Sequence, residues 1–269
     1  MRILCVADLH YRKNWFDWVT INSVDYDLTS ISGDLLYDSS VFGASTALPD
    51  WDGGRTPQLR LQSYQLAALF REHIEKSENG IFALCSGNHD PVFLWNADDG
   101  IGGLIGPRMI SDGETRFFPE ERVAITSIPY ELKSSEFEHR WIDAHNRARA
   151  QNCFWIVFSH EGPTGSSTML NARGGQPLRQ MIESHPADLL IHGHIHRAPW
   201  EAGGSWHAKI GRTLVLNPGS VEFRASSPSQ PPFITVDTSR GVIFWHGTEC
   251  EEEAQSLQFD SIGKTGSIG

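Results

Sequence analysis

The segment Cys85-Ser86-Gly87-Asn88-His89-Asp90 decides how the rest of the sequence is interpreted. An apolar run over residues 81–84 leads into it and predicts a buried strand over Ile81–Cys85, after which the chain turns at a glycine. An amide, an imidazole and a carboxylate then come in immediate succession. Burying so many polar groups costs free energy unless something binds them. A divalent metal ion that carries a phosphate ester would do so, because amide oxygens and neutral imidazoles are ligands for such ions.

Four other apolar runs end in side chains of the same kind. The runs and the polar residues after them are 3–7 with Asp8 and His10, Leu28–Ser32 with Asp34, 153–158 with His160, and Leu189–Ile191 with His194 and His196. Residues two apart in an extended segment point to the same side, so Asp8 and His10 can bind one ion. Because sites in open α/β sheets form at the carboxyl ends of strands, we expect all five ends to meet in one crevice.

The remaining periodicity predicts further helices and strands around these runs. Helices are expected over residues 62–76, from 134 to about 151, and in a short segment that begins at Pro177. Further strands are expected over Val123–Ile128, 214–216, 233–236 and 242–245. Residues 38–58 are expected to form a long surface loop, and a glycine-rich segment follows Asp90. This alternation of helices and strands predicts an α/β fold.

Composition is that of a globular protein, with 39% hydrophobic and 20% charged residues in 269. We expect one domain over residues 1–250. A tail over 251–269, acidic and then rich in Ser and Gly, is expected to be poorly ordered. The net charge of -11 argues against a broad basic surface for nucleic acid.

The cysteines and the first residues bear on the compartment. Cys5, Cys85, Cys153 and Cys250 are widely spaced and form no CxxC motif, so we expect free thiols in a reducing compartment. The apolar run after Met1 is interrupted at Asp8, too early for a signal peptide or a membrane span. We therefore expect a cytoplasmic protein with no membrane partner.

Taken together, the five motifs resemble the calcineurin-like metallophosphoesterase superfamily. Its pattern of DxH, GD, GNH[DE], an isolated His and GHxH is filled in order by Asp8 to His10, Gly33-Asp34, Gly87 to Asp90, His160 and Gly193 to His196. The resemblance extends from residue 3 to about residue 220. It implies a four-layer αββα sandwich, in which two mixed β-sheets are flanked by helices, with two divalent metal ions at the strand ends.

The resemblance also implies a role for each site residue. One ion would take Asp8, His10 and His196, the other would take Asn88, His160 and His194, and Asp34 would bridge them. Two cations lower the pKa of a shared water, so that a metal-bridging hydroxide can attack phosphorus. His89 is assigned as the general acid, and Asn88 and His89 would contact the substrate. Mn²⁺ is the expected metal, with Fe, Zn, Ni and Co as alternatives.

One departure from the family bears on the substrate. The protein Ser/Thr phosphatases of this superfamily carry GDxxDRG, whereas the segment from Gly33 to Asp38 has no Arg and its second Asp is displaced by one position. A protein phosphatase is therefore disfavoured, and Asp38 and Asp90 are both candidates for the partner of His89. The segment Leu216-Asn217-Pro218-Gly219-Ser220 is similar to one in small bacterial and archaeal phosphodiesterases. It favours a phosphodiester of a small molecule or nucleotide as the substrate.

Other functions stay open at this point. An SbcD-like nuclease shares these motifs, although the acidic balance weighs against it, and a phosphomonoesterase would use the same core residues. A non-catalytic interaction scaffold with this fold would be expected to lose ligands or the catalytic histidine, and this sequence keeps all of them. The natural substrate and the oligomeric state do not follow from the sequence.

Overall fold

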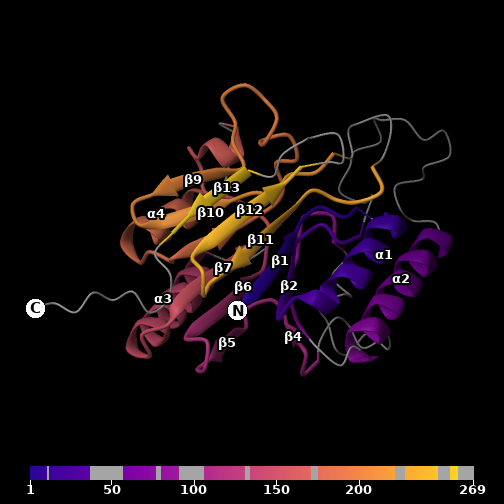
Figure 1. The fold of residues 1–269 in the computed structure, drawn as a ribbon, viewed down its shortest axis with the longest axis horizontal. Coiled ribbons are helices and arrows are strands. Elements are labelled where there is room, and N and C mark those ends of the chain that lie inside the picture. The colour runs from indigo at the N-terminus through magenta and orange to yellow at the C-terminus, as the bar shows by residue number, and fades with distance from the viewer. Residues whose placement is uncertain are drawn as a thin grey trace, which may run out of the picture.

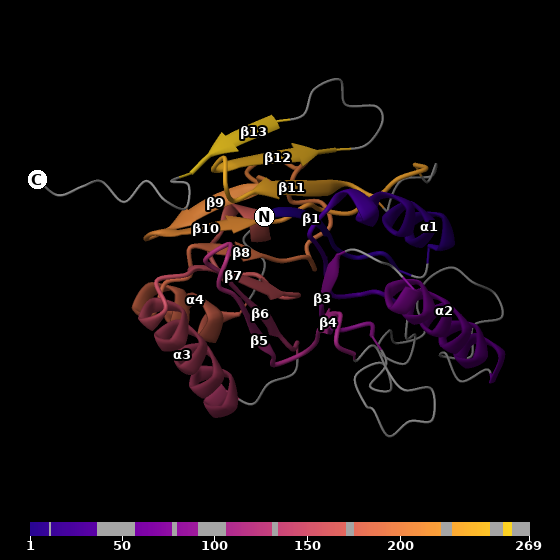
Figure 2. The same ribbon diagram turned by 60° about the horizontal axis from the view of Figure 1, so that its bottom comes forward.

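The computed structural model describes residues 1–10, 12–36, 57–76, 80–90, 106–130, 134–170, 175–221, 228–247 and 255–259. Two β-sheets lie face to face in the described part, with helices on the outside (Figures 1 and 2). Most of the predicted loop over 38–58 and of the glycine-rich segment after Asp90 lies outside the described residues, as does Cys250.

The first sheet has seven strands in the order β13-β12-β11-β1-β2-β3-β4. Their bounds are β1 Arg2–Val6, β2 Leu28–Ser32, β3 Ile81–Cys85, β4 Met109–Ile110, β11 Phe233–Asp237, β12 Val242–His246 and β13 Gln255–Gln258. The neighbours β1, β2 and β3 are parallel, whereas β11, β12 and β13 pair in an antiparallel manner. The sheet is therefore mixed, and three of its parallel strands end at the same edge.

The second sheet has six strands in the order β5-β6-β7-β8-β10-β9. Their bounds are β5 Thr115–Phe118, β6 Val123–Ile128, β7 Phe154–Ser159, β8 Leu189–Ile191, β9 His207–Ile210 and β10 Thr213–Leu216. The strands β6, β7, β8 and β10 are parallel, and the edge strands β5 and β9 are antiparallel to their neighbours. This sheet is mixed as well.

Helices cover the outer face of each sheet. The helices are α1 Lys13–Asn22, α2 Pro57–Lys76, α3 Ser134–Ala150 and α4 Gln176–Ser184, with short 3-10 turns η1 Ser23–Asp25 and η4 Ser167–Met169. Buried side chains of α1 and α2 pack against one face of the first sheet, and those of α3 and α4 pack against the second sheet. The predicted four-layer αββα sandwich is confirmed.

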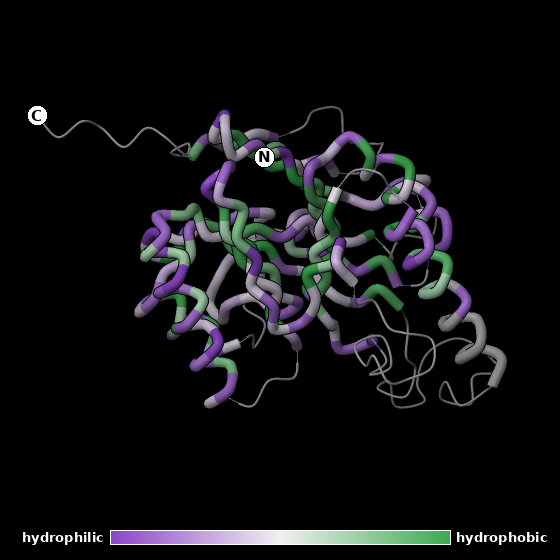
Figure 3. Tube along the Cα trace, turned by 90° about the horizontal axis from the view of Figure 1, so that it is seen from below, coloured by the Kyte–Doolittle hydropathy of each residue, from purple (hydrophilic) through white to green (hydrophobic). Residues whose placement is uncertain are grey.

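Alternation along the strands explains the layers. In β1, Ile3 and Cys5 face the second sheet, whereas Val6 faces α1 and α2. In β7, Phe158 lies between the sheets and Trp155 lies under α3. Strands buried on both faces must be apolar at nearly every position, which is the pattern that predicted them. Hydrophobic residues accordingly gather along the central strands in Figure 3, and hydrophilic ones lie mainly on the outside.

Most predicted elements are observed with small differences at their ends. The strands β2, β3, β6 and β8 have the predicted bounds, and α2 begins at Pro57 instead of residue 62. Proline suits the first turn of a helix, so the predicted loop was extended too far. Cys5, Cys85 and Cys153 are free and buried, as expected. Within the predicted C-terminal tail, Gln255–Gln258 form β13 and the last residues fall outside the described part.

In the part of the chain that the structure describes, no helix is both long and apolar enough to cross a membrane.

Candidate metal centre

The predicted site residues come from the ends of strands in both sheets. Asp8 and His10 follow β1, Asp34 follows β2, and Asn88 and His89 follow β3. From the second sheet, His160 follows β7, and His194 and His196 follow β8. Because these strands are parallel within each sheet, their carboxyl ends lie along one edge of the sandwich. The structure brings all the predicted site residues together there.

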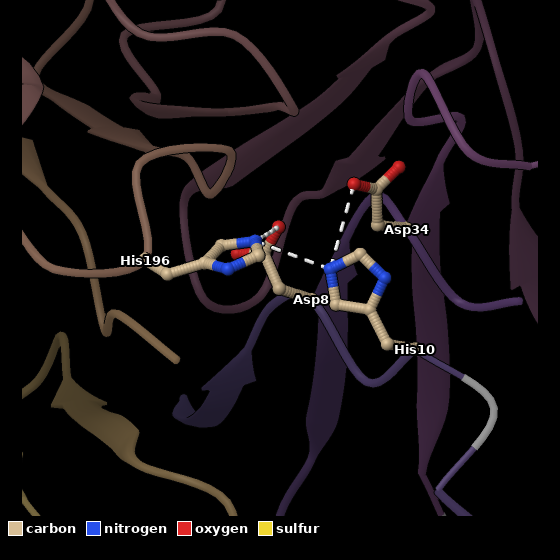
Figure 4. A group of neighbouring side chains, drawn as sticks. All are labelled: Asp8, His10, Asp34 and His196. Atoms are coloured by element: carbon tan, nitrogen blue, oxygen red, sulfur yellow. Dashed lines mark hydrogen bonds and ion pairs between the residues drawn. The ribbon is translucent and has the colours of Figure 1, made fainter. Parts of the chain in front are cut away.

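A first group of donor atoms comes from Asp8, His10, Asp34 and His196, whose ligand atoms all lie within 4.8 Å of one another (Figure 4). His10 Nε2 and His196 Nε2 are 3.1 Å apart, and His196 Nε2 is 3.3 Å from Asp8 Oδ1. Three of these four side chains are buried. The group therefore offers two imidazoles and two carboxylates to one small volume.

A second group lies beside the first and is made by Asn88, His160 and His194. Asn88 Oδ1 is 2.8 Å from His160 Nε2 and 2.9 Å from His194 Nδ1, and the two histidine nitrogens are 3.2 Å apart. Asp34 belongs to both groups, since its Oδ2 lies 3.3 Å from His160 Nε2 and 3.7 Å from His10 Nε2. The two groups thus share one carboxylate.

These distances fit a pair of metal ions. Two ligand atoms that are each about 2.1 Å from one ion, at right angles to each other, lie about 3 Å apart. The separations within both groups are close to that value. His160 Nδ1 is 3.0 Å from Ser32 O, and since a carbonyl only accepts, Nδ1 carries the hydrogen. His160 Nε2 therefore points toward the other donors, where it would bind a metal ion in place of a proton.

The backbone is strained at this site. Four of the seven described non-glycine residues with positive φ are Asp8, His10, Asp34 and His194, with φ of 54°, 44°, 49° and 70°. Such conformations cost about 1–3 kcal/mol each for ordinary residues and collect at functional sites. Hydrogen bonds hold them: Asp8 N donates to Gly33 O and His10 N donates to Asp34 O. The strained backbone at these four positions thus directs their side chains toward one point.

Two glycines of the motifs are required by close approach. A Cβ atom on Gly87 would overlap the backbone nitrogen and Oδ1 of Asp34. A Cβ atom on Gly193 would lie 2.6 Å from Asp8 Oδ2 and 2.8 Å from Ser32 O. Both contacts are far shorter than van der Waals distance. Glycine at 87 therefore lets the ends of β2 and β3 approach each other, and glycine at 193 lets the second sheet approach Asp8 of the first.

Electrostatics within the cluster favour a cation. Burial by itself raises the pKa of Asp8, but the neighbouring His196 and His160 outweigh it and lower that pKa below its usual range. Burial disfavours charge on His160, yet Asp34 and Asp8 raise its pKa to about 9. Burial and the charge of His160 lower the pKa of His194 to about 4. Two buried carboxylates thus remain ionised and attract positive charge.

His89 lies at the edge of the cluster. Its backbone N–H donates to Asp34 Oδ1 at 2.8 Å, and its Nε2 is 3.9 Å from Asp34 Oδ2. Asp90, one predicted candidate for its partner, accepts hydrogen bonds from the backbone of Leu36 and Gly87. Burial and the charge of Asp34 raise the pKa of Asp90. Asp90 therefore fixes the turn, while the other candidate, Asp38, lies outside the described residues.

Two supports of the cluster were not found from the sequence. The Tyr130 ring lies edge-on to His160 at a centroid distance of 5.6 Å and 6.1 Å from His194. Its backbone nitrogen donates to Ser86 Oγ, and Ser86 N donates to Asp112 Oδ1. The sequence predicts no role for Tyr130, because its neighbours in the cluster come from other strand ends.

The second support is Asn217, which lies in the segment similar to small phosphodiesterases and for which the sequence predicts no role of its own. Its Nδ2 donates to Ile195 O at 3.0 Å and to Thr168 O at 3.1 Å, and its Oδ1 accepts from Gly219 N at 2.8 Å. Ile195 lies between His194 and His196. The buried Asn217 side chain therefore holds the loop that carries one predicted ligand for each ion.

A sandwich of this kind with a buried Asp/His cluster at its strand ends defines a class of metal-binding α/β proteins. The chain belongs to the calcineurin-like phosphoesterase family, whose sequence profile matches residues 1–198 and so spans all five motifs. This family acts on phosphate esters and binds divalent metals, and the chain is accordingly a metal-dependent phosphoesterase by class. No curated protein matches the sequence.

Solved structures share the fold at low sequence identity. The chain is similar to the protein TT1561 of Thermus thermophilus, with 14% identity, a TM-score of 0.56, and 96% and 98% of the two chains covered. It is also similar to a dimetal phosphatase from Danio rerio, with 10% identity, a TM-score of 0.59 and 97% and 99% coverage. GAP50, the anchor in the inner membrane complex of Plasmodium, matches with 13% identity, a TM-score of 0.54 and 97% and 89% coverage.

Proposed function

We propose that this chain is a dinuclear metal-dependent phosphodiesterase that acts on small-molecule or nucleotide phosphodiesters. The observation that carries the proposal is the position of Asp34. Its Oδ2 lies between two groups of donor atoms, 3.7 Å from His10 Nε2 and 3.3 Å from His160 Nε2. A shared carboxylate between two sets of imidazole ligands is suited to a pair of ions about 3.5 to 4 Å apart.

The assignment of ligands follows the two groups. Asp8, His10 and His196 would hold one ion, Asn88, His160 and His194 would hold the other, and Asp34 would contact both. When bound, the two ions, with Mn²⁺ the expected metal, supply a water-derived nucleophile at neutral pH and neutralise the phosphoryl oxygens. The chain contributes donors that are buried or half-buried and lie on segments held by backbone hydrogen bonds, so little reorganisation accompanies the reaction.

His89 is assigned as the general acid. Its backbone is fixed to Asp34 and its ring lies beside the His10 ring, with centroids 5.4 Å apart. From this edge of the cluster the ring can donate a proton to the leaving oxygen, and with the Asn88 side chain it can contact the phosphate. General acid catalysis of this kind contributes about 10²–10⁴ in rate.

Charge favours a diester over a monoester. A phosphodiester carries one negative charge near neutral pH, whereas a phosphomonoester carries close to two. The segment from Gly33 to Asp38 supplies no arginine, and the chain as a whole carries a net charge of -11. Both features disfavour the second charge of a monoester, and the overall charge also disfavours a nucleic acid substrate, as an SbcD-like nuclease would require.

The test is hydrolysis of two related chromogenic substrates by purified protein supplied with Mn²⁺. We expect bis-p-nitrophenyl phosphate to be cleaved faster than p-nitrophenyl phosphate. Faster cleavage of the monoester would favour a phosphomonoesterase. Inactivity on both substrates, with bound metal confirmed by elemental analysis, would overturn the enzyme proposal.

A scaffold function is the second candidate, because one structurally similar protein, GAP50, is described as an anchor. The variant His89→Ala separates the two functions. We expect it to lose about a hundredfold or more in rate while it keeps its metal ions. A scaffold would lose nothing measurable.

A further inference from the structure

A pocket lies beside the candidate metal centre, at the carboxyl ends of β6 and β7 and against the start of α4. It shares Tyr130 and His160 with the centre. Most of its wall is apolar and comes from Ile128, Pro129, Phe137 and Leu178. The pocket and the metal centre thus share two side chains, so the pocket lies next to the place where a phosphate ester would bind.

Among the described residues that line this pocket, Glu161 supplies the one carboxylate. Glu161 directly follows His160, and a hydrogen bond from Ser159 Oγ to Glu161 O at 2.9 Å fixes this segment of backbone. Its Oε2 lies 3.1 Å from the point where a Cβ on Gly175 would be, so the side chain lies along the start of α4.

No arginine or lysine forms a salt bridge with Glu161 among the residues that the structure describes. A half-buried carboxylate attracts a cation and repels an anion. Two aromatic side chains, Tyr130 and Phe137, line the same pocket. Aromatic faces together with a carboxylate recognise alkylammonium groups, through cation–π attraction on one side and direct charge pairing on the other.

We infer that this pocket holds one ester group of the phosphodiester substrate. The group that it selects carries a positive charge and an apolar surface, as an alkylammonium does. The inference rests on the proposed function and adds the class of substrate. The same carboxylate disfavours an ester group that carries further negative charge, such as the phosphates of a nucleoside polyphosphate.

The experiment compares p-nitrophenyl phosphorylcholine with ethyl p-nitrophenyl phosphate, using Mn²⁺-loaded protein. Both diesters release the same p-nitrophenol, so they differ in the other ester group, which is cationic in the first and neutral in the second. We expect kcat/KM to be at least about fivefold higher for the cationic diester, which corresponds to about 1 kcal/mol of cation–π and charge interaction.

Glu161→Gln tests the role of the carboxylate, because glutamine keeps the shape and removes the charge. We expect this variant to lose most of the preference for the cationic diester, mainly through a higher KM. Glu120→Gln, at an exposed position in the turn between β5 and β6, removes the same charge at the opposite end of β6 from the pocket and should keep the preference. Thermal denaturation and metal content verify that each variant folds and binds metal.

The outcomes separate this inference from the proposed function. Hydrolysis of both diesters with equal kcat/KM, or a preference that Glu161→Gln leaves intact, would overturn the inference while the phosphodiesterase proposal stands. Failure to hydrolyse either diester or bis-p-nitrophenyl phosphate, with metal bound, would overturn both.

Discussion

Replacing Asn217 by alanine tests how the fold holds its predicted metal ligands. Asn217 is fully buried, and its side chain makes three hydrogen bonds, two to the carbonyls of Ile195 and Thr168 and one from Gly219 N. Alanine leaves Thr168 O and Gly219 N without this partner, whereas Ile195 O loses one hydrogen bond and keeps the one from Ala198 N. At about 1–3 kcal/mol for each unsatisfied group, with partial relaxation, we expect a loss of roughly 3–5 kcal/mol in the free energy of unfolding.

The same change is expected to weaken metal binding at both sites. Ile195 lies between His194 and His196 in the sequence. When its carbonyl loses the hydrogen bond from Asn217, the loop can shift, and one predicted ligand of each ion moves with it. Outer partners of metal ligands typically contribute about 10–100-fold in affinity, and we expect a loss of that size. Calorimetric titration of metal-free protein with Mn²⁺ measures it, at a temperature where circular dichroism shows that the variant is folded.

Two further variants sharpen this test. Asn217→Asp keeps the acceptor for Gly219 N but loses the two donors, so it should weaken metal binding about as much as alanine does. Asn146→Ala, at an exposed position on α3, should leave metal binding unchanged. If Asn217→Ala lowered the melting temperature but bound both ions with wild-type affinity, the loop would not depend on Asn217 and the reasoning would be refuted.

Three other predictions concern a buried acid, a glycine and the metal itself. Burial raises the pKa of Asp112 to about 6 from an ordinary 3.8. The folded state therefore binds this proton more tightly, and wild-type stability falls as pH rises between these values. Relative to wild type, Asp112→Asn in metal-free protein should gain roughly 2–3 kcal/mol between about pH 4 and about pH 7 in urea denaturation, and a difference independent of pH would contradict this. Gly193→Ala should cost about 1–3 kcal/mol and weaken metal binding, because its Cβ would displace Asp8, whereas Gly106→Ala meets only Met109 at 3.6 Å and should do neither. Saturating Mn²⁺ should raise the melting temperature of metal-free protein by about 5–10 °C, and an unchanged melting temperature would argue against binding to the folded state.

The sequence was most informative where strands are buried on both faces. Such strands are continuous apolar runs, and β3 and β8 have the predicted bounds for that reason. The edge strands β5 and β9 were missed because their side chains are largely half-exposed and show no apolar run. Helix α1 was missed as well, since no side chain caps its start and it buries only Trp15, Phe16 and Val19.

The site was predictable to the extent that its chemistry is local. Each predicted ligand follows a recognisable strand, so its residue type and position identified it. The structure places these residues together. Their coordination of metal stays a prediction. Tyr130, Asn217 and Glu161 could not be found in this way. Their roles depend on which strand ends and helix starts lie side by side across the two sheets, which no local pattern encodes.

The most direct test of the central claim is anomalous diffraction from crystals grown with Mn²⁺. We expect two anomalous peaks in the cluster, both within about 2.1–2.4 Å of Asp34, one also bound by Asp8, His10 and His196 and the other by Asn88, His160 and His194. Crystals with no peak in the cluster, or with a single peak that Asp34 does not contact, would contradict a dinuclear centre in this protein.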